Sequence, residues 1–334
     1  MSQLEPRPVR RPFDGLVPET VLEAVEQVAG LRADGRLFAL NSYENRVYQV
    51  GLEDAPPVVV KFYRSNRWSD AQILEEHAFA AELAARDLAV AVPLGRQGQT
   101  LLRSGDFRFA VFPWLGGRAF AIDERASLTI LGRALGRLHR VGAVRPFEQR
   151  QILDPALMGA AARRRVLHSP QLDPALRERY AEISALLLDR IVAEFSALDD
   201  VGYLRIHGDC HPGNVLWNEQ GAVFVDLDDC VMGPSMQDLW MFLAGESDEQ
   251  RGRWQALSEG YLEFAEFDHR ELRLVEPLRA LRMLRHVAWI AERWDDPAFP
   301  MAFPGFAQPR FWEGHLSELM EQMPLLEDPP VLRG

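Results

Sequence analysis

The chain has 334 residues, of which 47% are hydrophobic and 26% are charged. This balance is typical of a globular protein and excludes a mainly disordered or fibrous chain. Lys and Arg total 37 and Asp and Glu total 49, so the formal net charge is −12. We expect no nucleic-acid partner, because such a protein needs a basic surface to neutralise phosphates. At roughly 100–200 residues per domain, the length predicts two domains or one large two-lobed unit.

The cysteine count and the absence of long apolar runs bear on location. The two cysteines, Cys210 and Cys230, exclude a disulfide framework and a zinc site built from Cys-x-x-Cys pairs. A reducing cytoplasm is therefore the expected setting. The first residues lack a signal-peptide apolar stretch, and no apolar run approaches the ~20 residues that span a bilayer. We expect no membrane partner.

The N-terminal third is predicted to form a helix followed by an antiparallel sheet. Residues 1–17 are expected to be an irregular arm, and residues 18–29 carry apolar side chains at helical spacing, ended by Gly30. A capping box at residues 69–72 predicts the start of a long helix that reaches about residue 86. Strands are predicted at residues 36–40, 46–51, 57–63, 100–102 and 107–112, with an antiparallel hairpin between the second and third.

From residue 118 onward the pattern is mostly helical. Helical spacing of apolar residues predicts helices over 128–138, 172–198 and 276–294, and a β-rich island interrupts them at 203–206, 215–217 and 223–225. Pro and paired Gly at residues 113–117 indicate a linker between the two parts. The sequence therefore predicts an α+β protein, with a β-rich N-terminal part and a helical C-terminal part.

The β-rich island carries the residues with the clearest chemistry, HGDCHPGN at 207–214 and FVDLDD at 224–229. Phosphoryl transfer needs one carboxylate that accepts or orients the attacking hydroxyl, and an amide plus a carboxylate that hold Mg²⁺. The spacing of Asp209, Asn214 and Asp226 matches the protein-kinase pattern H-R-D-x-x-x-x-N followed by D-F-G. Gly208 stands in place of the Arg, and Leu227-Asp228 in place of Phe-Gly.

Two other interpretations of these residues stay open. A single Asp in such a loop is most often only solvated, although that explains one residue better than the whole arrangement. Zinc sites use His and Cys at short spacing, so His207, Asp209, Cys210 and His211 are a second possible cluster. Against zinc, His207 follows an apolar strand and no second cluster is evident.

The N-terminal part is expected to supply a nucleotide clamp. Residues 58–61 read Val-Val-Val-Lys, like the kinase strand V-A-I-K, so Lys61 is predicted to bind phosphates and a Glu on the next helix. Glu76 lies on an apolar face of that helix and Glu75 on a more polar one, so we choose Glu76, with Glu75 as the fallback. No G-x-G-x-x-G or Walker A motif occurs, and the polar residues 41–45 take the place of the Gly-rich loop.

Together these residues resemble the aminoglycoside phosphotransferase/choline kinase branch of the protein-kinase-like fold, and within it the stress response kinase A family. The most specific segments are SYENRVYQ at 42–49 and VDLDD at 225–229. Further segments run in order along nearly the whole chain: VVVKFYR at 58–64, FAVFPWLGGR at 109–118, GPSMQDLW at 233–240 and WDDPAFP at 294–300.

The resemblance implies a two-lobed fold with an antiparallel-sheet N-lobe over residues 1–113, a hinge linker at 114–117 and a mainly helical C-lobe over 118–334. It implies an ATP- and Mg²⁺-dependent Ser/Thr protein kinase of the bacterial cytoplasm, linked to stress survival. The expected partners are ATP and a protein substrate with a Ser or Thr. We expect a monomer.

The resemblance also implies roles for single residues. Asp209 is the expected proton acceptor, Asp238 steadies the catalytic loop, and His286 stands where the family has an aromatic residue. One residue more than in the family pattern is placed in the turn near 219–221. The remaining assignments are Asp226 as a catalytic and Mg²⁺-binding residue, Asn214 as the second Mg²⁺ ligand, Ser42, Lys61 and Glu76 as ATP contacts, and Phe112, Trp114 and Leu115 as the adenine-binding hinge.

Two further alternatives remain. A kinase of a small hydroxylated or aminated metabolite, of the aminoglycoside, choline or homoserine kind, fits the lack of room for a long activation loop between Asp226 and Gly233. In that case Asp228 and Asp229 attract a cationic substrate; otherwise they are charges around Mg²⁺. A pseudokinase that only binds partners is opposed by the intact kinase residues. Arg279, Arg282, Arg285, His286, Trp289 and Arg293 either line a peptide groove or form a solvated face beside a buried Trp.

Overall fold

The computed structural model describes residues 11–219 and 221–333, so residues 1–10 of the predicted arm and Gln220 of the turn at 219–221 lie outside it. The described chain forms two compact units. The sheet unit contains the residues up to Leu74 together with 93–114 and 294–302, and the helical unit contains 75–92, 115–293 and 303 onward. The lobes expected from the sequence are continuous, whereas these units exchange two segments, 75–92 and 294–302.

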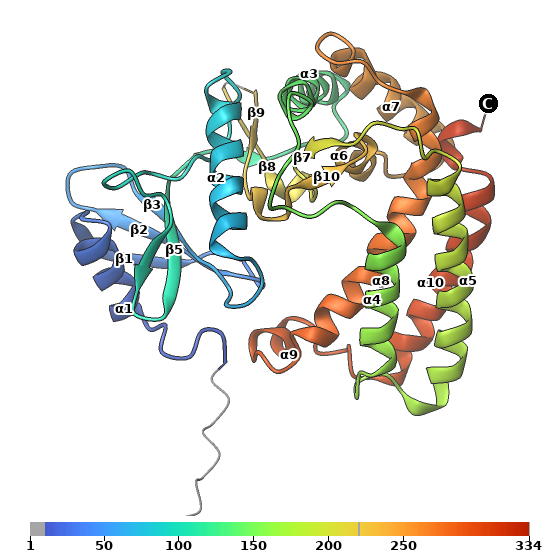
Figure 1. Ribbon diagram of the computed structural model, residues 1–334, viewed down its shortest axis with the longest axis horizontal. Helices are drawn as coiled ribbons and strands as arrows, with labels where there is room; N and C mark the ends of the chain where they lie inside the picture. Colours follow the sequence, from blue (N-terminus) through green and yellow to red (C-terminus); the bar gives the residue numbers. More distant parts are fainter. Residues whose placement is uncertain (1–10, 220, 334) are drawn as a thin grey trace, which may run out of the picture. The chain divides into compact units, whose positions relative to one another are not determined.

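The sheet unit is an antiparallel five-stranded sheet in the order β1-β2-β3-β5-β4 (Figure 1). Its strands are β1 (Ala33–Ala39), β2 (Arg46–Leu52), β3 (Val58–Phe62), β4 (Leu102–Ser104) and β5 (Phe107–Pro113). The predicted hairpin is confirmed, since Val50 lies opposite Val58. The strand expected at 100–102 begins two residues later, as β4.

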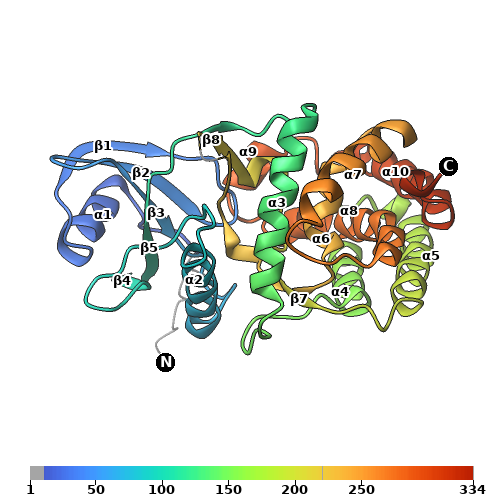
Figure 2. The same ribbon diagram turned by 90° about the horizontal axis from the view of Figure 1, so that it is seen from above.

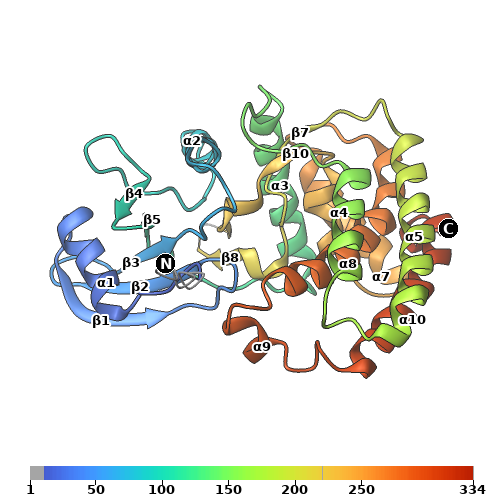
Figure 3. The ribbon, with the colours of Figure 1, turned by 60° about the horizontal axis from the view of Figure 1, so that its bottom comes forward.

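One face of this sheet is covered by α1 (Pro18–Glu23), as Figure 3 shows. The helix continues as a π-helical turn over Ala24–Val28 and ends before Gly30, whose φ is +72°. Val21 and Val25 pack here with the sheet residues Val60 and Phe109 in one buried apolar cluster. The predicted helix is thus present, but its second half is wound more loosely.

The helical unit is built mainly on long helices (Figure 2). They are the second part of α2 (Asp70–Ala84), then α3 (Arg125–Gly142), α4 (Pro155–Leu167), α5 (Arg177–Ser196), α7 (Ser247–Tyr261), α8 (Val275–Glu292) and α10 (Pro309–Glu327). Leu128, Leu131, Leu135 and Leu138 are all buried, which confirms the predicted apolar stripe of α3. The short α6 (Met236–Leu239) carries Asp238, and α9 (Ala298–Ala302) belongs to the sheet unit.

The predicted capping box opens α2. Ser69 N donates to Gln72 Oε1 at 2.9 Å, and Gln72 N donates back to Ser69 Oγ at 3.2 Å. The β island of the helical unit contains β7 (Leu204–Ile206) paired with β10 (Val231–Gly233), and β8 (Val215–Asn218) between β6 (Arg118–Ala119) and β9 (Gly221–Phe224). No helix of the described residues has the length and apolar character needed to cross a membrane.

Candidate active site

The loop at residues 207–214, here called the catalytic loop, follows β7 directly and leads into β8. Its sharpest feature is Gly208, which has φ +85°. A β-carbon at this position would lie 2.1 Å from the carbonyl oxygen of Asp229. Only glycine combines that dihedral angle with that close approach, which gives a physical reason why Gly208 replaces the Arg of the kinase pattern.

The catalytic loop is held by Asp238, a fully buried carboxylate on α6. Asp238 Oδ2 accepts from His207 N at 2.7 Å, and Oδ1 accepts from Gly208 N at 2.8 Å. His139 Nε2 lies 3.1 Å from Oδ2, and the other ring nitrogen is 2.8 Å from the Tyr261 hydroxyl. The expectation that Asp238 steadies this loop is confirmed.

Asn214 and Asp226 are brought to the same end of the hairpin formed by β8 and β9. Val215 lies opposite Phe224 in the antiparallel register, and Val225 N donates to the Asn214 carbonyl at 3.1 Å. Asn214 Nδ2 donates to the Asp209 carbonyl at 3.0 Å, which leaves the amide oxygen as the group that can bind a cation. Asp226 is exposed with φ +60°, whereas Asp228 is 2% exposed.

This donor set fits Mg²⁺. One carboxylate and one amide oxygen at a solvent-accessible hairpin end suit an ion that keeps several waters and binds phosphate oxygens. Asp226 and Asn214 would hold the ion, and its positive charge would neutralise part of the phosphate charge. Among the described residues, no group of three or more His, Cys, Asp or Glu is arranged to hold a metal, so the alternative zinc cluster at residues 207–211 does not form.

Asp209 lies in the catalytic loop with both carboxylate oxygens near nitrogen-bearing side chains. Arg282 Nη1, from α8, contacts Oδ1, and His211 Nε2 lies 3.6 Å from Oδ2. Burial lowers the pKa of His211, with Arg282 adding to the effect and Asp209 opposing it. The His211 ring is therefore neutral near pH 7, and Arg282 is the fixed positive charge beside Asp209.

The predicted phosphate clamp is divided between the two units. Lys61 is 6% exposed on β3, opposite Ala110 of β5, with Nζ 5.2 Å from the centre of the Tyr63 ring. Glu76 is 3% exposed on α2, in the helical unit. The fallback Glu75 accepts three backbone amides, from residues 148–150, at 2.6–2.9 Å. Glu75 therefore holds a loop, and the pairing of Lys61 with Glu76 stays a prediction.

Ser42 lies half-buried in the loop at residues 41–45, here called the β1–β2 loop. Arg64 holds this loop by donating to the carbonyls of Tyr43 and Glu44 at 3.1 and 2.8 Å. Asp296 in turn accepts from Arg64 at 2.8 Å and from Arg46 at 2.8 Å. Burial alone would raise the pKa of Asp296, but the hydrogen bond from Arg64 and the other positive neighbours outweigh it and lower that pKa.

The sequence alone does not identify Arg64 and Asp296 as site residues. The only signal lay in the segments already quoted for the resemblance, since Arg64 ends VVVKFYR and Asp296 lies in WDDPAFP. The structure gives the physical reason why these distant segments and SYENRVYQ belong together. All three meet in the sheet unit at the β1–β2 loop.

The predicted hinge residues lie at the end of β5 and directly after it. Phe112 lies opposite Val59 on β5 and is partly buried against a cluster that includes Tyr63. Trp114 follows β5 and is 40% exposed, and its backbone N–H donates to the Pro57 carbonyl at 3.3 Å. Leu115 is the first of the helical-unit residues after this strand. Their role in adenine binding remains a prediction.

The arginines of α8 do not form one uniform solvated row. Arg279 Nε donates to Glu276 at 2.9 Å, and its guanidinium lies 5.1 Å from the centre of the Trp240 ring. Arg282 binds Asp209. Trp289 is half-buried and stacks with His286 at a centroid distance of 5.7 Å. His286 thus fills the expected aromatic position with a flat ring.

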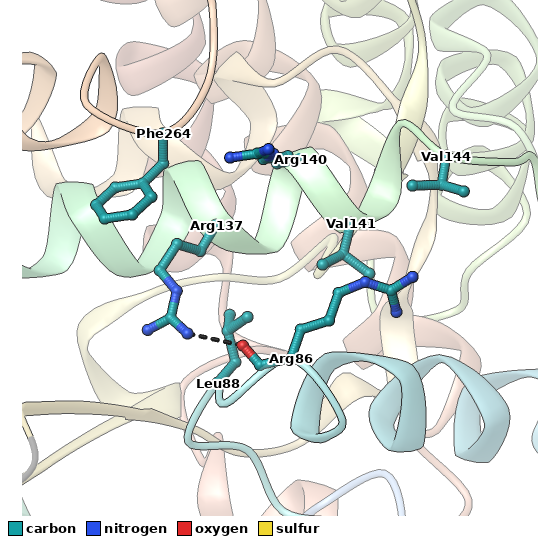
Figure 4. A pocket seen from close by; sticks show the side chains of 7 residues that line it. All are labelled: Arg86, Leu88, Arg137, Arg140, Val141, Val144 and Phe264. Atoms are coloured by element: carbon teal, nitrogen blue, oxygen red, sulfur yellow. Dashed lines mark hydrogen bonds between the residues drawn. The ribbon is translucent and has the colours of Figure 1, made fainter.

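A separate cavity of about 320 Å³ lies in the helical unit between the end of α2 and the second half of α3 (Figure 4). Arg137 donates to the Arg86 carbonyl at 2.7 Å across it. None of the predicted site residues lines this cavity, whose walls are Arg86, Leu88, Arg137, Arg140, Val141, Val144 and Phe264.

The comparisons with known proteins agree with this geometry. The model of the phosphotransferase enzyme family matches residues 37–275. Stress response kinase A of Escherichia coli (strain K12) is 42% identical over 96% of each chain, and the serine/threonine protein kinase RdoA of Salmonella typhimurium (strain LT2) is equally similar over the same shares. Amicoumacin kinase hAmiN, solved with AMP-PNP, Ca²⁺ and Ami, shares the fold with a TM-score of 0.67, at 17% identity, over 90% of this chain and 93% of its own.

The fold and the catalytic loop therefore define a phosphotransferase with a two-lobed, protein-kinase-like α+β architecture. The chain belongs to the phosphotransferase enzyme family, and within it to the stress response kinase A family.

Proposed function

We propose that this phosphotransferase is a protein kinase that uses Mg²⁺ and ATP to phosphorylate Ser or Thr in a bacterial stress response. The observation that carries the proposal is the arrangement of Asp209, Asn214 and Asp226 around one loop and one hairpin, anchored by buried Asp238. The names of the relatives support the protein substrate and the stress response. The ATP analogue and divalent cation bound by the amicoumacin kinase support the nucleotide and the metal.

In the proposed reaction, a Ser or Thr hydroxyl approaches Asp209, which orients it and accepts its proton. The hydroxyl oxygen forms a bond to the γ-phosphorus as the bond from that phosphorus to the β–γ bridging oxygen breaks, and ADP leaves. Asn214 and Asp226 hold Mg²⁺, which neutralises phosphate charge when bound. Ser42, Lys61 and Glu76 position the phosphates, and Phe112, Trp114 and Leu115 take the adenine.

A small-molecule kinase is the second candidate, because one observation favours it. Only the short 3₁₀ turn Leu227–Asp229 and strand β10 lie between Asp226 and the Gly233 end of that strand, so no long activation loop exists there. The fold shared with the amicoumacin kinase is compatible with this alternative. Against it, Asp228 is almost fully buried and does not offer its charge to an incoming cationic substrate.

Transfer from γ-labelled ATP separates the two candidates. The full chain is incubated with Mg²⁺ and either a set of Ser- and Thr-containing proteins or a panel of amino alcohols, aminoglycosides and hydroxy acids. We expect labelled protein, with label lost in the Asp209→Asn variant and kept in Asp189→Asn, which changes an exposed Asp of α5. Turnover of a small molecule with no labelled protein would replace the proposal with the second candidate.

A further inference from the structure

The environment of Asp209 bears on which acceptor can reach it. Oδ1 is contacted by Arg282 and Oδ2 faces His211 at 3.6 Å, so a hydroxyl that reaches either oxygen comes to lie beside one of these groups. A hydroxyl that is activated by a carboxylate has to come within about 3 Å of it. Within the described residues, Asp209 is the one carboxylate partner of Arg282, whose side chain is 44% exposed. An acceptor that binds at Oδ1 therefore shares this oxygen with the exposed guanidinium of Arg282.

One other α8 arginine, Arg279, does not share this position. Arg279, one turn earlier, is already bound to Glu276 and packed on Trp240. Toward the C-terminus of α8, His286 and Trp289 lie at the i+4 and i+7 positions and therefore share the face of Arg282. Phe303 meets both rings edge-on at centroid distances of 6.0 and 5.9 Å. Arg282 thus has Asp209 as its carboxylate partner and an aromatic surface along the same helix face.

His286, four residues further along α8, does not add to this charge at neutral pH. Burial lowers the pKa of His286, and the positive charge of Arg282 lowers it further, while Asp209 opposes the effect. An acceptor that enters this site therefore meets the fixed positive charge of Arg282 beside the carboxylate that is to receive its proton.

We propose that Arg282 selects acceptors that carry a carboxylate or phosphate group next to the reacting hydroxyl. The acceptor hydroxyl donates to Asp209 Oδ1, and the neighbouring guanidinium binds the acceptor's anionic group. A cationic amino alcohol offers no such partner and places like charge beside Arg282. This inference rests on the proposed function, and for a protein substrate it predicts a Ser or Thr with an acidic neighbour.

The test compares acceptors that differ only in charge. Peptides with one Ser flanked by Glu, Gln or Lys are phosphorylated by the wild type, Arg282→Ala and Arg282→Glu. The matched control is Arg165→Ala, whose arginine pairs with Glu292 at the far end of α8, about 15 Å along the helix axis from Arg282. Glycerate and aminopropanol form a second pair, which distinguishes a free anionic metabolite from an acidic peptide.

We expect the wild type and the control to prefer the Glu peptide over the Gln peptide by about tenfold in kcat/KM. We expect Arg282→Ala to lose the preference for the Glu peptide and Arg282→Glu to prefer the Lys peptide. An equal loss for all three peptides would mean that Arg282 serves the transferred phosphate instead, and would overturn the inference. So would a wild type without preference.

A binding measurement keeps the inference testable if no acceptor is phosphorylated. Peptides with Ala in place of Ser are titrated onto the protein with Mg²⁺ and AMP-PNP present. Tighter binding of the Glu peptide that is lost in Arg282→Ala supports the anion site even where the proposed activity fails. Equal affinity of the Glu and Lys peptides for the wild type contradicts it.

Discussion

The catalytic loop and the β1–β2 loop are both polar loops next to strands, yet they are held by groups of opposite charge. The catalytic loop donates two backbone N–H groups to one buried carboxylate, Asp238. The β1–β2 loop instead offers its carbonyls to Arg64, which is backed by Asp296 from 232 positions further along the chain. The catalytic loop is centred on one buried carboxylate, with additional bonds such as Gln237 Nε2 to the Gly208 carbonyl at 2.7 Å, whereas the β1–β2 loop is held by a network over three segments.

This difference predicts how each loop responds to substitution. A buried anion that binds two amides has no substitute when its geometry is lost, because each unsatisfied buried group costs about 1–3 kcal/mol. A network of arginines, carbonyls and one carboxylate loses a part of its contacts at a time. We therefore expect changes around the catalytic loop to be severe and changes around the β1–β2 loop to be graded.

The largest effect is expected at the metal end of the hairpin. Asp226→Ala removes an exposed carboxylate and should weaken Mg·ATP binding about a thousandfold, since a divalent ion contributes several kcal/mol to holding phosphate charge. Asp228→Asn, at a buried neighbour, is the control and should change affinity far less. Isothermal titration of Mg·ATP into both variants measures this. Loss of binding in the Asp228 variant alone would show that the wrong carboxylate was assigned.

The next largest effect concerns the backbone of the catalytic loop. In Gly208→Ala, the new β-carbon clashes with the Asp229 carbonyl, and the positive φ adds strain, so the loop must shift. We expect a loss of about 2–3 kcal/mol in unfolding free energy, together with reduced turnover. Gly202→Ala is the control, because its β-carbon meets nothing within 4 Å. Urea unfolding of both variants gives the comparison, and equal stabilities would refute the strain argument.

The two loops differ from helices α2 and α3 in how far the sequence could predict them. Ser69 and Gln72 predicted the start of α2, and the spacing of the leucines predicted the buried face of α3, because these signals are local or periodic. Glu76 was preferred to Glu75 from the same kind of local pattern. The bond from Arg64 to Asp296 is not encoded at any short spacing, since the two side chains meet only after the chain has folded. Nor does sequence show that Gly208 approaches the Asp229 carbonyl.

A moderate effect is expected at the anchor of the β1–β2 loop. Asp296→Asn weakens the bonds to Arg64 and Arg46 without changing side-chain size. If this loop positions ATP phosphates, KM for ATP should rise about tenfold while kcat changes less than about twofold. Asp295→Asn changes the exposed neighbouring carboxylate and serves as the control. Steady-state kinetics at varied ATP concentration measures both constants. An unaltered KM would show that the Arg64–Asp296 network does not contribute to nucleotide binding.

The smallest effect is a pH dependence of stability. The folded-state pKa of Asp296 lies below its ordinary value of 3.8, so its ionised form stabilises the fold. That contribution is complete above about pH 4 and is lost as pH falls through the folded-state pKa. The difference in unfolding free energy between wild type and Asp296→Asn should therefore shrink from neutral pH toward pH 3. Denaturant unfolding at several pH values measures this difference. A difference that stays constant with pH would contradict a lowered pKa for Asp296.

The most direct test of the account is the turnover of Asp209→Asn. The change keeps the side-chain shape and removes the carboxylate that accepts the hydroxyl proton, so we predict a fall of about 10²–10⁴-fold in kcat. Affinity for Mg·ATP and the melting temperature should stay close to the wild type, as in the Asp189→Asn control. A variant that transfers phosphate at the wild-type rate, with Mg·ATP bound normally, would contradict the assignment of Asp209 as the proton acceptor.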